Sequence, residues 1–180
     1  RVLTDYIDFV RASQPSLRYV VEKSWNSYNN NILALLFGGI KEVFLVREPS
    51  EFLESQKAFL RKEGVSEDQV RTQHQSSAHR LGNLARAWND RKSVAHLIKY
   101  ERLVADPAET LSDLCDYLEL YRSPEFIQTA VSMIRDDSAH TQMLRTDRSG
   151  DAKNEFKAFL NSLDPDQIAS AEYYLDEFGY

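Results

Sequence analysis

The chain has 180 residues, of which 42% are hydrophobic and 28% are charged, a balance typical of a soluble globular protein. No apolar run approaches the roughly 18 residues that a membrane span needs, so we expect no membrane-spanning segment. The net charge of −6 makes nucleic acid an unfavourable partner, and any phosphate site must therefore be a local cluster of cations.

The single cysteine, Cys115, cannot form an internal disulfide. It falls in the apolar stripe of a helical pattern with Leu111, Leu114 and Leu118, which predicts a buried packing thiol rather than a nucleophile. One cysteine and four histidines also argue against a structural zinc site, and we expect no metal. A free thiol favours a reducing compartment, so we expect a cytoplasmic location.

Three short β-rich runs interrupt a mostly helical pattern, at Leu17–Glu22, Glu42–Val46 and Val94–Tyr100. The second run is almost wholly apolar, which predicts a strand that is covered on both faces. Helical patterns lie between and after these runs, at Tyr28–Phe37, Ser50–Glu63, Glu67–Trp88, Pro107–Leu120, Pro124–Ile134 and Pro165–Phe178.

Ser50 and Asp164 are the predicted N-caps of the helices that begin near them. Strands that alternate with helices predict right-handed parallel crossovers and hence a three-layer α/β domain. We therefore expect one domain over residues 1–180, with a short parallel sheet and a helical C-terminal half.

Cationic and aromatic residues follow the three predicted strands: Lys23 the first, Arg47 the second and Tyr100 the third. Open parallel sheets bind ligands beyond the carboxyl ends of their strands. These residues therefore predict a site for a phosphorylated, aromatic ligand at one edge of the sheet.

The segment KEVFLVREPSEFLESQ resembles the 3'-phosphate-binding strand and helix of sulfotransferases that use 3'-phosphoadenosine-5'-phosphosulfate (PAPS). In that family a strand ends in Arg, a Pro turn follows, and a helix carries a Ser eight positions after the Arg. Arg47 and Ser55 have this spacing, and the resemblance implies that both contact the 3'-phosphate. The alternative is that Arg47 only pairs with Glu51 on the next helical turn.

Two later segments resemble further motifs of the same family. LIKYERLVADPAETLSDLCDYLEL is similar to a strand, Tyr-Glu-x-Leu, Asp-Pro and helix block, which implies that Tyr100 lies near the adenine. MLRTDRSGDAKNEF resembles a late phosphate-binding loop, which implies that Arg145 and Lys153 contact the nucleotide. Asp147 stands where the family has Gly, and we expect Arg148 to compensate for that acid.

The stretch before the Arg47 strand resembles the family's region around the transferring group, which implies a catalytic role for Lys23. Trp25 stands where the cytosolic branch has a His base. The family's 5'-phosphosulfate loop resembles a P-loop, and nothing in Arg1–Glu22 fits it. We therefore expect the natural chain to begin further upstream, and the 180 residues alone to lack turnover.

The resemblance implies a P-loop-like sulfotransferase fold and transfer of a sulfuryl group from PAPS to an acceptor hydroxyl or amine, with 3'-phosphoadenosine-5'-phosphate (PAP) as product. The implied acceptor is a small molecule, a carbohydrate or another hydroxyl-bearing compound, and the reaction requires no metal. A non-catalytic nucleotide-binding or assembly module remains open as an alternative. A third interpretation is a relative of the P-loop kinases, which tight ATP binding in preference to PAP would favour.

Overall fold

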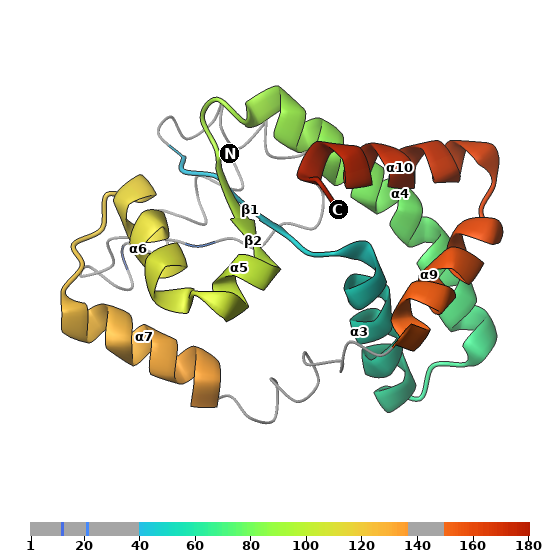
Figure 1. The fold of residues 1–180 in the computed structure, drawn as a ribbon, viewed down its shortest axis with the longest axis horizontal. Helices are drawn as coiled ribbons and strands as arrows, with labels where there is room; N and C mark the ends of the chain where they lie inside the picture. The colour runs from blue at the N-terminus through green and yellow to red at the C-terminus, as the bar shows by residue number, and fades with distance from the viewer. Residues whose placement is uncertain (1–11, 13–20, 22–39, 137–149) are drawn as a thin grey trace.

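The computed structural model describes residues 12, 21, 40–136 and 150–180, except for the side chains of residues 135, 136, 150–153 and 155. These residues form two strands and seven helices. In Figure 1 the strands lie between one group of helices that contains α3, α4, α9 and α10 and a second group that contains α5, α6 and α7. The predicted strand Leu17–Glu22 (apart from Val21) and the predicted helix Tyr28–Phe37 lie outside the described residues.

The strands β1 (Val43–Val46) and β2 (His96–Lys99) pair in parallel, as the sequence predicts. The register places Val46 opposite Lys99, so the residues that follow the two strands leave the sheet side by side. A crossover of 49 residues, most of them in the helices α3 and α4, separates the strands, as a parallel connection requires.

Helix α3 (Pro49–Lys62) begins directly after β1. Its N-cap is Glu48, whose carboxylate accepts a hydrogen bond from the backbone N–H of Glu51 at 3.0 Å, so the predicted cap at Ser50 is wrong. The cap precedes the expected position because Pro49 occupies the first helical turn, where a missing N–H costs nothing. Ser50 is instead buried and donates its hydroxyl hydrogen to the Glu48 carboxylate.

The long helix α4 (Glu67–Arg91) packs along α10 (Pro165–Phe178). Both helices begin with a capping box, and the one at Asp164 confirms the predicted N-cap. Helix α10 ends at Gly179, whose φ of 66° is in the left-handed region that favours glycine.

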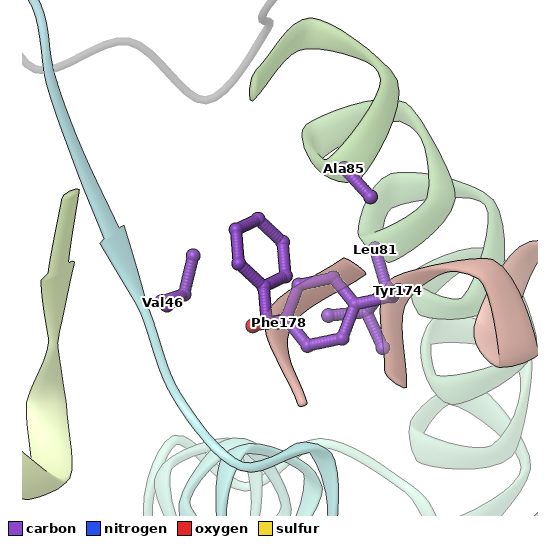
Figure 2. Close-up of a cluster of buried hydrophobic side chains, with 5 residues drawn as sticks. All are labelled: Val46, Leu81, Ala85, Tyr174 and Phe178. Atoms are coloured by element: carbon purple, nitrogen blue, oxygen red, sulfur yellow. The ribbon is translucent and has the colours of Figure 1, made fainter. Parts of the chain in front are cut away.

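The two rings of Tyr174 and Phe178 fill the space between β1 and α4, as Figure 2 shows. From the strand, Val46 packs against them, and Phe44 meets the Trp88 ring edge-on at 5.5 Å between centroids. No described helix covers the other face of β1, where Leu45 is 56% exposed. The expectation of a strand covered on both faces is therefore wrong, because among the described residues only one face of β1 packs against the helix pair α4 and α10.

Next to β2 lie α5 (Tyr100–Ala105), α6 (Pro107–Tyr117) and α7 (Pro124–Asp136), of which α5 and α6 contact that strand. Tyr117 ties α6 to the sheet, because its hydroxyl accepts from the backbone N–H of Glu42 and donates to the carbonyl of Val94. Cys115 is buried in α6, as predicted.

Helix α9 (Gly150–Asn161) packs on α3, where Phe159 joins Leu53 and Ala78 in a second buried cluster. Of the segment Met143–Phe156, expected to be a phosphate-binding loop, the described part is therefore helical from Gly150 onward. Phe156, Phe159 and Leu160 explain the difference, because their spacing of three and four residues forms one apolar helical face. Among the described helices, none combines the length and apolar character that crossing a bilayer demands.

The α4–α10 contact yields a stability prediction at Gly82, where a β-carbon would lie 2.7 Å from the Cβ of Ser170 and 3.0 Å from its Cα. Gly82→Ala should lower the free energy of unfolding by about 1–3 kcal/mol, because overpacking outweighs the better helix propensity of Ala. Urea unfolding measures the change. His79→Ala, at an exposed position of the same helix, is the control, and equal stability of the two variants would contradict the close packing.

Candidate functional site at the strand ends

The parallel register brings Arg47 and Tyr100 into direct contact at the carboxyl ends of β1 and β2. The guanidinium carbon of Arg47 lies 4.5 Å from the centre of the Tyr100 ring, a cation–π geometry. The predicted proximity of these two residues is therefore observed. Tyr100 is the first residue of α5 rather than the last of the strand, so the start of this helix positions its ring.

Arg47 also forms an ion pair with Glu51, one turn into α3. Both Nε and one terminal nitrogen of the guanidinium donate to the same carboxylate oxygen, each at 3.3 Å. The Arg47 side chain is only 11% exposed and that of Glu51 20%, so the pair is largely shielded from water. The pairing with Glu51 that the sequence left open is thus present together with the Tyr100 contact.

The backbone that carries Arg47 is held by side chains from distant parts of the chain. The Tyr174 hydroxyl accepts from the Arg47 N–H at 3.2 Å and donates to the Arg47 carbonyl at 2.9 Å. The Glu101 carboxylate accepts from the N–H of the next residue, Glu48, at 2.7 Å. Three successive backbone groups at the strand end are therefore satisfied by two side chains.

These two side chains are linked through Tyr180. Its hydroxyl donates to the second carboxylate oxygen of Glu101 at 2.9 Å, and its ring stacks on the Tyr174 ring at 6.1 Å and 6°. The Lys99 ammonium lies 4.9 Å from the centre of the Tyr180 ring and donates to the carbonyl of Phe178. The end of α10 is thereby joined to the ends of both strands.

Burial raises the pKa of Tyr174 well above its ordinary value, and the nearby Glu101 and Glu48 carboxylates raise it further. The pKa of Tyr180 is also raised, first by burial and then by its hydrogen bond to Glu101, since that bond uses the protonated hydroxyl. Both hydroxyls therefore stay protonated donors at physiological pH.

The remaining residues predicted for the site fall into two groups. Ser55 is half-buried on α3, four residues after Glu51 and hence on the same helical face, one turn further along. Lys153 lies in the first turn of α9, but its side chain is outside the described part of the structure. Lys23, Arg145 and Arg148 also lie outside the described residues.

A shallow cavity of about 360 Å³ lies elsewhere, between α3, α4 and α9. None of its lining residues comes from the strand ends: they are Lys57, Glu67, Val70, Arg71, His74, Ala158, Phe159 and Ser162. Within residues 40–136 and 150–180, no group of three or more histidine, cysteine or acidic side chains could hold a metal ion.

Glu101, Tyr174 and Tyr180 are residues of this site that the sequence did not single out. Glu101 follows Tyr100 directly, so its position after a strand was a usable signal. Tyr174 offered none, because a Tyr in the apolar stripe of a helix is more often a core residue. Tyr180 follows the end of α10 and belongs to no local pattern.

A family model described as "Sulfotransferase family" matches residues 3–124, more than half of the chain. The matched range contains Lys23, Arg47, Ser55 and Tyr100, whereas the late segment with Arg145 lies beyond it. No curated protein and no solved structure matches the chain at a significant level.

The buried tyrosine predicts a loss of stability in alkali. Tyr174 has a higher pKa in the folded chain than its ordinary value of 10.0, so above about pH 10 the unfolded chain loses this proton first. The free energy of unfolding should therefore fall as the pH rises from about 10 to 11.5, and less steeply in Tyr174→Phe. Tyr121→Phe, at a 90% exposed position, is the matched control for urea unfolding at each pH. Identical slopes for the wild type and Tyr174→Phe would contradict the prediction.

Proposed function

The chain belongs to the sulfotransferase family, and from that premise we propose that it transfers a sulfuryl group from PAPS to the hydroxyl or amine of a small-molecule or carbohydrate acceptor. The observation that carries this proposal is the contact of Arg47 with Tyr100 at two parallel strand ends, inside the segment that the family model matches. A cation and an aromatic ring at this position suit a nucleotide that carries both a phosphate and a base.

In this proposal Arg47 binds the 3'-phosphate, since its guanidinium presents a planar fork of donors. The N-terminus of α3 begins two residues later and adds the positive end of its dipole. Ser55 contributes a hydroxyl from the same helix, and Tyr100 borders the adenine while it orients the guanidinium. Arg145, Arg148 and Lys153 add cations to the nucleotide site.

The ion pair with Glu51 defines how the phosphate reaches Arg47. Because Arg47 is only 11% exposed and Glu51 accepts from its Nε and one terminal nitrogen, the phosphate takes the place of the carboxylate at these donors. Glu51 then acts as a counter-ion that the ligand displaces, and its repulsion of the phosphate lowers the affinity.

Sulfuryl transfer resembles phosphoryl transfer, a loose in-line displacement in which catalysis is mostly positioning and cationic stabilisation of the leaving phosphate. PAPS supplies the reactive sulfuryl group, and the chemistry requires no metal. In this proposal Lys23 lies near the reacting end and stabilises negative charge there. Arg47, Ser55 and Tyr100 hold the nucleotide at the other end, so that the reacting groups meet in line.

For the fold, we propose a P-loop-like, three-layer arrangement in which residues 1–180 form a single domain. Two features support it: the parallel pairing of β1 and β2 across a helical crossover, and the packing of α4 and α10 on β1 and of α5 and α6 on β2. Helix α10 contacts α4 over most of its length, so the C-terminal helix belongs to the same packing unit as the crossover.

Arg47→Ala tests the 3'-phosphate assignment. A charge-assisted hydrogen bond contributes about 1.5–3 kcal/mol, so the affinity for PAP should fall about ten-fold to a hundred-fold. Adenosine 5'-phosphosulfate, which lacks the 3'-phosphate, should lose little affinity. Calorimetry of both ligands measures this difference, with Arg80→Ala at an exposed position as control. Equal losses for the two ligands would show that Arg47 does not bind the 3'-phosphate.

Glu51→Gln tests the displacement of the counter-ion. The ion pair that the phosphate must break contributes about 0.5–1 kcal/mol. Its removal should therefore raise the affinity for PAP about two-fold to five-fold, with no gain for adenosine 5'-phosphosulfate. Glu63→Gln, exposed beyond the far end of α3, is the control for a change in net charge. A loss of PAP affinity in Glu51→Gln would mean that the carboxylate orients Arg47 rather than competes for it.

A further inference from the structure

The short connection from β1 to α3 is held mainly by side chains from distant parts of the sequence. It consists of Arg47 and Glu48, between the last strand residue and Pro49. Of the backbone groups of these two residues, the N–H and carbonyl of Arg47 and the N–H of Glu48 are hydrogen-bonded to side chains 127 and 53 residues away. The path of the connection is therefore set by Tyr174 and Glu101.

These hydrogen bonds also set where the guanidinium of Arg47 lies. The Tyr174 hydroxyl bridges the N–H and the carbonyl of the same residue, which fixes the orientation of both flanking peptide planes and hence of the Cα–Cβ bond. Glu101 holds the same Arg47–Glu48 peptide group by its N–H, from the start of α5, whose first residue is Tyr100. One carboxylate thus links the turn that carries Arg47 to the helix that carries its aromatic partner.

Tyr180 couples the two anchors. It donates to Glu101 and stacks on Tyr174, so the same residue braces the carboxylate and the ring. Tyr174 is 1% exposed, which excludes water as a competing partner for its hydroxyl. Tyr174 and Glu101 thus hold the backbone at Arg47, while the guanidinium contacts Tyr100 and Glu51.

We propose that Tyr174 and Glu101 are positioning residues that aim Arg47 at the 3'-phosphate, and that Tyr180 at the end of α10 completes this support. The inference rests on the proposed function of Arg47 and deepens it. It makes the C-terminal helix part of the nucleotide site, although this helix lies beyond the segment that the family model matches. Positioning of this kind is sensitive to small displacements, because a bidentate contact needs both donors in place.

Binding measurements on point variants test the proposal. Tyr174→Phe retains the ring and removes the hydroxyl, and Glu101→Ala removes the carboxylate. Each should lower the affinity for PAP about two-fold to ten-fold, the range expected for one or two neutral or charge-assisted hydrogen bonds, and leave adenosine 5'-phosphosulfate within about two-fold. Glu101→Gln should recover most of the PAP affinity, because its amide oxygen can still accept from Glu48.

A double-mutant cycle separates positioning from general stabilisation. If Tyr174 acts through Arg47, Tyr174→Phe should cause no further loss of PAP affinity in the Arg47→Ala background. Tyr180→Phe, at a half-buried position, should show a smaller loss of PAP affinity that again spares adenosine 5'-phosphosulfate. It is the second variant if Tyr174→Phe does not fold. Thermal melting confirms that each variant is folded at the temperature of the measurement.

The outcomes distinguish this inference from the proposed function. A PAP-selective loss in Arg47→Ala without one in folded Tyr174→Phe, Tyr180→Phe and Glu101→Ala overturns the positioning role and leaves the function of Arg47 intact. Additive losses in the cycle, or equal losses for both ligands in all three of these variants, also overturn it. Absence of a PAP-selective loss in Arg47→Ala itself overturns both proposals.

Discussion

The parallel pairing of β1 and β2 is the constraint on which the rest of the described structure depends. Because Val46 is opposite Lys99, Arg47 and Tyr100 emerge at the same edge and at the same level. A helix begins within three residues of the end of each strand, so both residues stay close to the sheet. A single change of register by one residue would reverse which face each side chain takes and would separate the guanidinium from the ring.

Two strands alone form too small a sheet to be stable, so the helices must supply the stability. Helices α4 and α10 do so through Tyr174 and Phe178, which are buried between them and β1 (Figure 2). Tyr174 has a second role, because its hydroxyl reaches past the core to the backbone of Arg47. One side chain therefore belongs both to the hydrophobic core and to the edge of the site, and its apolar and polar parts can be separated by mutation.

The features that could be predicted from the sequence are those with a local signal. The apolar runs located both described strands, and the helical apolar patterns located five of the helices. The six-residue helix that starts at Tyr100 is too short for an apolar period, and the exposure of Leu45 depends on what packs against the strand. The hydrogen bonds of Tyr174 and Tyr180 span 127 and 79 residues, which no local pattern encodes.

Electrostatics explains how an acidic chain can still present a cation to a phosphate. Three carboxylates stand close to Arg47, and each has a specific partner. Glu48 caps α3, Glu101 accepts from a backbone N–H and from Tyr180, and Glu51 pairs with the guanidinium. Of these contacts, only that of Glu51 uses guanidinium donors, which a phosphate on Arg47 would need. The other two carboxylates fix the turn, so these acids support Arg47 structurally, and in the proposed binding mode only Glu51 competes with the phosphate.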